Sequence, residues 1–102
     1  MIIMKIRELP VEFTRRGVSF KQIAKTEDYY IYELTKDDSV WYEVFKNRLS
    51  GLHPMDQEVD MYDKQVAYPS DECFGSWAWC CSDWKCVQKV MEREFGIADF
   101  QI

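Results

Sequence analysis

The stretch from Tyr68 to Gly96, YPSDECFGSWAWCCSDWKCVQKVMEREFG, is the part of the chain from which the fold is best read. It contains three of the four tryptophans, all four cysteines and the one long segment with helical periodicity. A polar loop comes first, and an alternating strand and an amphipathic helix follow it.

The last part of the stretch predicts a helix over roughly residues 83–95. At about 100° per residue, four apolar side chains fall on one stripe, with Val90 on its flank. These four are Trp84, Val87, Met91 and Phe95. Ser82 is the predicted N-cap, because its hydroxyl can accept from an unpaired backbone N–H, and Gly96 is predicted to end the helix in a left-handed conformation.

Residues 76–81 predict the strand that precedes this helix. Trp77, Trp79 and Cys81 alternate with Ala78 and Cys80, so one face is bulky and the other is small. We expect the small face to lie under the helix.

The first half of the chain predicts further antiparallel strands. Residues 29–35 and 40–47 are rich in aromatic and β-branched side chains, and the short polar connection between them indicates a hairpin. An alternation that begins at Val18 reaches Ile23 only after a slip of one position, which predicts a bulged strand.

Weaker strand signals lie at residues 2–9 and 64–68, and residues 49–63 show no regular pattern. The predicted fold class is α+β: an antiparallel, meander-like sheet of four or five strands with one C-terminal helix packed on one face. A chain of 102 residues is expected to form one such domain, spanning residues 1–102.

Composition narrows the functional classes. No apolar run approaches the roughly 18 residues of a membrane span, and the first ten residues do not resemble a signal peptide, so we expect a cytoplasmic protein with reduced cysteines and no membrane partner. The net charge is −5, and it is uneven: residues 1–50 have nine basic and eight acidic side chains, whereas residues 51–102 have four and ten. This acidity disfavours a protein that follows a phosphate backbone.

Four short motifs occur in order along the chain. They are Phe20-Lys21-Gln22-Ile23, Tyr42-Glu43-Val44-Phe45, Tyr68-Pro69 and Phe74-Gly75-x-Trp77-Ala78-Trp79. Together they resemble a family of small, uncharacterised proteins encoded by phages and prophages of gut bacteria, over about Phe13 to Trp79. The resemblance implies a mobile-element context and no particular activity. The cysteine pair after Trp79 and the acidic residues 56–63 depart from the family pattern.

The cysteines do not have the spacing of a metal site. Cys73, Cys80, Cys81 and Cys86 contain no C-x2-C pair, and adjacent cysteines on a strand point to opposite faces, so we predict no metal. No cofactor signature is present in the sequence, so we predict no cofactor, and a reducing cytoplasm predicts no disulfide. Cys86 lies outside the apolar stripe, toward the basic side of the helix. A partly exposed thiol near cations has a lowered pKa, which makes Cys86 the predicted reactive thiol.

Catalytic patterns are weak. His53 is the only histidine, and nothing marks one cysteine as its partner in a Cys–His pair. The acids from Asp56 to Asp63 resemble part of a calcium loop, but Met61 stands where glycine is needed and Ala67 where glutamate is needed. We therefore predict that the chain is not an enzyme.

Two binding functions remain. Aromatic side chains on the sheet, with cations in the same half, could stack on bases and contact phosphates of a single nucleic-acid strand, or the aromatics could instead be core. With a net charge of −5 we favour a protein-binding module of unidentified partner, with a homodimer also possible and nucleic acid as the alternative. The predicted binding surface comprises Arg15, Arg16, Lys21, Tyr32, Trp41, Trp77 and Trp79.

Overall fold

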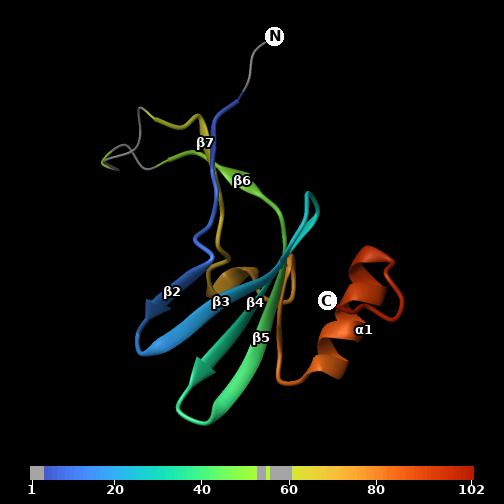
Figure 1. Cartoon of the computed structure of the whole chain (residues 1–102). Coiled ribbons are helices and arrows are strands. Elements are labelled where there is room, and N and C mark those ends of the chain that lie inside the picture. The colour runs from blue at the N-terminus through green and yellow to red at the C-terminus, as the bar shows by residue number, and fades with distance from the viewer. Residues whose placement is uncertain (1–3, 53–54, 56–60) are drawn as a thin grey trace.

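The computed structural model describes residues 4–52, 55 and 61–102. Its strands and helices are β1 (Ile6–Arg7), β2 (Glu12–Arg15), β3 (Val18–Lys25), β4 (Tyr29–Lys36), β5 (Ser39–Lys46), β6 (Leu49–Ser50), β7 (Lys64–Val66), the 3-10 helix η1 (Asp71–Cys73), β8 (Ala78–Cys81) and α1 (Trp84–Phe95). A five-stranded antiparallel sheet has the order β2-β3-β4-β5-β8, and a smaller sheet has the order β1-β7-β6 (Figure 1). The predicted α+β class, with an antiparallel sheet and one C-terminal helix, is confirmed.

Helix α1 packs on one face of the five-stranded sheet. Val87 and Met91 are fully buried in one cluster with Ile31 of β4 and Val44 of β5. At the two ends of the stripe, half-buried Trp84 and Phe95 meet aromatic rings of the sheet, with Trp84 5.5 Å from Tyr42 between ring centroids and Phe95 5.2 Å from Tyr29. The predicted apolar stripe is therefore the packed side of the helix.

The N-cap of α1 is Asp83, so the prediction of Ser82 is wrong by one residue. The Asp83 carboxylate accepts a hydrogen bond from the backbone N–H of Cys86 at 2.8 Å. A carboxylate satisfies this role as well as a hydroxyl and adds a negative charge at the positive end of the helix. At the other end Gly96 has φ 68°, and its N–H donates to the Glu92 carbonyl, as predicted.

Strand β8 presents the opposite face to α1 from the one predicted. Trp79 and Cys81 belong to the cluster beneath the helix, whereas Ala78 is buried in the other cluster and Cys80 is exposed. The register explains this, because Trp79 lies opposite Val44, and ladder partners share a face. Trp79 fits there because β8 is an edge strand, so its indole lies beside α1 and 6.3 Å from the Phe95 ring.

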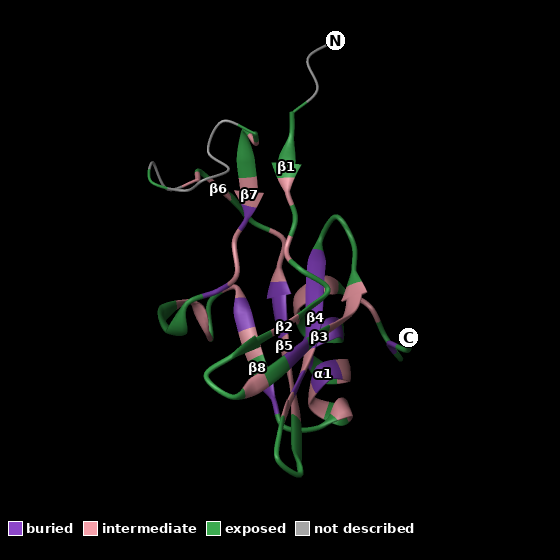
Figure 2. Ribbon diagram, turned by 60° about the vertical axis from the view of Figure 1, so that its left-hand side comes forward, coloured by how far each residue is buried: buried purple, intermediate pink, exposed green. Residues whose placement is uncertain are grey.

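The second face of the sheet is covered by irregular chain. Tyr30 and Tyr32 both stack on Phe45, with interplanar angles of 8° and 6°. Tyr68 and Trp77, from the loop that holds η1, meet the Phe45 ring edge to face. Figure 2 shows the resulting band of buried residues along the central strands.

The weaker strand predictions are confirmed in part. β1 and β7 exist, but they pair with each other in parallel, with Ile6 opposite Lys64, in the small sheet rather than in the main one. The bulge predicted in β3 is present, since its register with β4 shifts between Gln22 and Ala24. The β4–β5 hairpin is also present.

Candidate functional site

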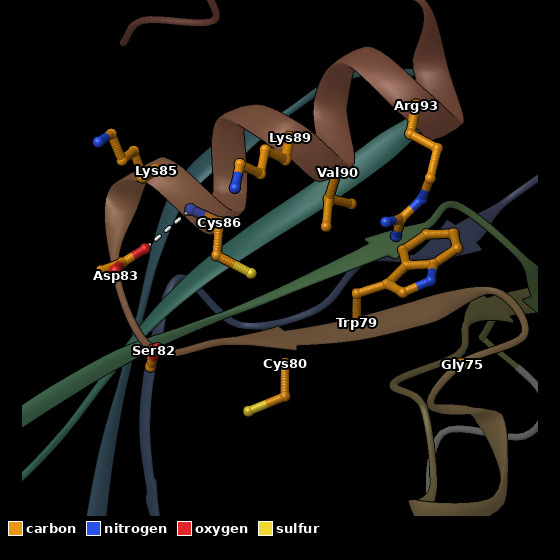
Figure 3. Close-up of a pocket in the computed structure, with 10 residues that line it drawn as sticks. All are labelled: Gly75, Trp79, Cys80, Ser82, Asp83, Lys85, Cys86, Lys89, Val90 and Arg93. Carbon is orange, nitrogen blue, oxygen red and sulfur yellow. Dashed lines mark hydrogen bonds between the residues drawn. The ribbon is translucent and has the colours of Figure 1, made fainter.

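A groove of about 540 Å³ lies between α1 and the edge strand β8 (Figure 3). One wall is the side of α1 that carries Cys86 and Val90, and the other wall includes Trp79 and Cys80 of β8. The turn at Gly75 lines one end, and Ser82 lines the other. We refer to this feature as the α1–β8 groove.

Three cations line the α1–β8 groove: Lys85, Lys89 and Arg93. A spacing of four residues places them on one side of the helix, each about 6 Å further along the axis than the last. The Nε atom of Arg93 also pairs with Glu94 Oε2 at 2.7 Å. Within the described part of the chain, neither Lys85 nor Lys89 forms an ion pair.

These three side chains are most of the positive charge in their half of the molecule. Residues 51–102 contain four basic side chains and ten acidic ones, and three of the four basic ones line this groove. Among the described residues that line the groove, Asp83 is the one with an acidic side chain. Its carboxylate already accepts a hydrogen bond from the backbone N–H of Cys86. The groove therefore has a local excess of positive charge on an acidic protein.

The outer edge of β8 supplies backbone hydrogen-bonding groups to the same groove. Lys46 N–H donates to Trp77 C=O, and hydrogen-bonded pairs alternate along an antiparallel ladder, so Trp79 also points its backbone groups at β5. Ala78 and Cys80 therefore point theirs outward. The outward carbonyl of Ala78 already accepts a hydrogen bond from the Gly75 N–H, at 2.7 Å. No loop or side chain in the described ranges hydrogen-bonds the outward N–H and C=O of Cys80.

Two thiols lie next to each other beside the groove. Cys86 is half-buried in its wall, and Cys81 is fully buried beneath it. Burial raises the pKa of the Cys81 thiol, and the neighbouring Cys86 raises it further. Partial desolvation, and then the charge of Glu43, raise the pKa of the exposed Cys80, whose side chain lies on the side of β8 away from α1 (Figure 3). The reactivity of Cys86 remains a prediction, now for a thiol that is half-buried among groove residues.

The predicted binding surface does not form one site. Tyr32 is fully buried, and its hydroxyl donates to the Pro10 carbonyl at 2.6 Å, so its assignment to a binding surface is wrong. The reason is that the loop around Tyr68 covers this end of the aromatic face. Trp41 is half-buried against the same cluster.

The predicted cations are also divided. Arg15 lies 5.4 Å from the ring centroids of both Phe20 and Tyr68, and with Arg16 it lines a second cavity of about 400 Å³ on the aromatic face. Lys21 lies on the other side of the sheet, because it neighbours Phe20 along β3 and side chains alternate.

The two predicted tryptophans of the C-terminal half also separate. Trp77 is half-buried under the guanidinium of Arg48, which is 5.0 Å from its ring. Trp79 lines the α1–β8 groove. The other six residues of the predicted binding surface are not among the described residues that line it.

Glu43, an acid that points into the aromatic face, was not among the predicted site residues. Its carboxylate accepts a hydrogen bond from the Tyr68 hydroxyl. Burial raises the pKa of Glu43, although the Tyr68 hydrogen bond and the Arg15 charge act in the opposite direction. Burial, and then Glu43 itself, also raise the pKa of Tyr68. The available signal was the alternation Trp41, Glu43, Phe45, which puts an acid between two aromatics on one face.

The candidates weighed from the sequence also included a Cys–His pair with His53, a calcium-like loop and a metal site. His53 and the acids at 56–60 lie outside the described residues. Among the residues that are described, no group of three or more histidine, cysteine or acidic side chains lies together as a metal site would require.

Comparison with known proteins gives no relative. No family model, no curated protein and no solved structure matches this chain. Across the described ranges, no helix has both the length and the apolar character needed to cross a membrane.

Proposed function

We propose that this chain is a non-enzymatic protein-binding module, and that it holds an acidic segment of its partner in the α1–β8 groove. The observation that carries the proposal is the gathering of Lys85, Lys89 and Arg93 along one groove of an otherwise acidic half. An acidic partner gains ion pairs there without meeting the rest of the negative surface. At physiological ionic strength charges further than about 8 Å are largely screened, so the local sign of the groove matters more than the net charge.

The groove also has apolar surface to add to these charges. Exposed ion pairs contribute only about 0.2–1 kcal/mol each, so charge alone gives weak binding. Half-buried Trp79 and Cys86 provide apolar contact area beside them. Aromatic residues and arginine are enriched at protein interfaces for this combination of properties.

A titration with a labelled, glutamate-rich peptide tests the proposal. The groove variant carries Lys85→Glu, Lys89→Glu and Arg93→Glu, and we expect it to lose binding that the unmodified chain shows by fluorescence anisotropy. The matched control carries Lys21→Glu, Lys36→Glu and Lys64→Glu, three exposed lysines elsewhere, so the net charge changes equally. Equal loss in both variants would mean that overall charge, and not the groove, determines binding.

A single-stranded nucleic-acid binder is the second candidate. It is favoured by the cavity of about 400 Å³ that Arg15 and Arg16 line together with the rings of Phe20 and Tyr68. In that case an oligothymidylate should bind more tightly than the acidic peptide, its affinity should fall as salt rises, and Arg15→Ala with Arg16→Ala should remove it.

The biological setting is proposed on the sequence alone. The four ordered motifs support a phage or prophage origin, and four unpaired cysteines suit a cytoplasmic location. A second copy of the chain is the alternative to a different protein as partner.

A further inference from the structure

We infer that the partner segment binds the α1–β8 groove as an extended strand that pairs with β8 and carries acidic side chains at alternate positions. The inference rests on the proposed function and specifies its ligand. It adds a backbone conformation and a sequence pattern to the requirement for negative charge.

The free edge of β8 calls for a strand. Cys80 directs one N–H and one C=O away from β5 into the side of the groove, with no partner among the described groups. Unpaired edges of this kind are where extended peptides add to a sheet in known recognition modes. The bridge between Phe74 and Ala78 already extends the sheet at one end, so the incoming segment takes the next positions, beside Cys80 and Ser82.

The cations of α1 match a strand laid along this edge. α1 runs back alongside β8 after the turn at Ser82 (Figures 1 and 3), so the row of cations follows the same direction as the edge. A four-residue step along a helix is about 6.0 Å, and a two-residue step along a strand is about 6.6–6.8 Å. Over three positions the difference is roughly 1.5 Å, which long lysine and arginine side chains accommodate. Every second residue of the strand would therefore face a cation.

The intervening residues meet a different environment. They point to the opposite face of the sheet, beside the side chain of Cys80, which is the ladder partner of Glu43. A carboxylate placed there would approach the negative charge of Glu43, and like charges on one face of a sheet destabilise pairing. The preferred ligand therefore has acids at alternate positions and uncharged residues between them.

Two synthetic peptides of identical composition test this pattern. One carries three glutamates at alternate positions among threonine and valine residues, and the other carries the same glutamates consecutively. We expect the alternating peptide to bind the unmodified chain about tenfold more tightly, since only it can form the ion pairs and the strand hydrogen bonds together. The groove variant Lys85→Glu, Lys89→Glu, Arg93→Glu should bind neither, and circular dichroism should show that it is folded.

Backbone methylation tests the strand pairing separately. In two further versions of the alternating peptide, N-methyl groups replace the amide hydrogens of either the odd or the even residues. A strand presents alternate amides to its neighbour, so one version should lose binding and the other should keep it. The single variant Lys89→Ala is a milder test. It should bind both peptides more weakly than the unmodified chain does and still bind the alternating peptide more tightly than the consecutive one, which would show that the pattern does not depend on the triple variant.

The outcomes separate the two claims. Equal affinity of the alternating and consecutive peptides, or equal loss with both methylated versions, overturns the strand inference but leaves an acidic-ligand groove. Binding of neither peptide overturns the proposed function as well. Tighter binding of oligothymidylate at the groove would assign it to nucleic acid instead.

Self-association is the remaining outcome. Asp56, Glu58 and Asp60 of this chain are themselves acids at alternate positions. The concentrated protein can be tested for a dimer by sedimentation. A dimer that is lost in the variant Asp56→Asn, Glu58→Gln, Asp60→Asn would show that the groove binds a second copy of this chain, and would overturn the assignment to a different protein.

Discussion

The two faces of the five-stranded sheet are both buried, but by different kinds of cover. On one face a regular helix packs aliphatic side chains such as Val87 and Met91 onto Ile31 and Val44. On the other face an irregular loop places the rings of Tyr68 and others over a set of stacked aromatics. On the aromatic face the covering loop also hydrogen-bonds the sheet, since the half-buried carboxylate of Glu43 accepts from the Tyr68 hydroxyl.

This difference shows how the two covers can be formed from one sheet. A helix meets its hydrogen-bonding needs internally, so it needs only an apolar stripe to pack on a sheet. A loop must find partners for its polar groups, and tyrosine rings let it combine apolar area with a hydroxyl that hydrogen-bonds. Tyr68 does both, since it packs on Phe45 and donates to Glu43.

The largest effect is expected from Phe45→Ala. Phe45 is fully buried, and its ring contacts Tyr30, Tyr32 and Tyr68. Its removal should lower the free energy of unfolding by about 3–5 kcal/mol. Chemical denaturation measures this, with Val40→Ala on the same strand as the exposed control, expected within about 0.5 kcal/mol of the unmodified chain. A loss below about 1 kcal/mol for Phe45→Ala would show that the loop does not form a packed core on this face.

A somewhat smaller loss is expected on the helix face, from Met91→Ala. Met91 is fully buried between α1 and the sheet, so its truncation should cost about 2–5 kcal/mol. Alanine at Trp84 or at Phe95 should lower the free energy of unfolding by less than the loss of a fully buried ring does, because both rings are only half-buried. Glu92→Ala, on the exposed side of the same helix, is the control. If Met91→Ala behaves like this control in denaturation, α1 is not held by its apolar stripe.

The smallest effect, and one of opposite sign, is expected from Glu43→Gln. The pKa of Glu43 is raised in the folded chain by burial, so the folded state holds this proton more readily than the unfolded state. The ionised carboxylate therefore lowers stability at neutral pH, and the penalty disappears as the pH falls through its pKa. Glutamine should stabilise the chain at pH 7, with the difference shrinking in acid.

Melting temperatures of the unmodified chain and of Glu43→Gln, measured from pH 7 down into the acid range, check the prediction. Glu12→Gln, at an exposed position, is the control. Lower stability of Glu43→Gln at pH 7 would mean that the charge of Arg15 and the Tyr68 hydroxyl outweigh burial, and that the acid contributes favourably to the aromatic face.

Local sequence patterns determined the elements that depend on neighbours in the chain. The stripe of α1, its end at Gly96, the β4–β5 hairpin and the bulge in β3 were all predicted, because helical periodicity, turn residues and alternation act over a few residues. The row Lys85, Lys89, Arg93 could have been read in the same way, since a spacing of four is visible in the printed sequence. The N-cap was predicted one residue too early, at Ser82, because serine and aspartate both suit this position and the structure uses Asp83.

The tertiary structure decided everything that depends on distant pairing. Both faces of β8 and of β4 carry apolar residues, so alternation cannot tell which face meets the helix or that Tyr32 is covered by a loop from residues 68–77. The parallel pairing of β1 with β7 joins segments almost sixty residues apart, with no local signal. The α1–β8 groove exists because β8 lies at an edge of the sheet, and edge position is a property of the strand order, which only the assembled chain sets.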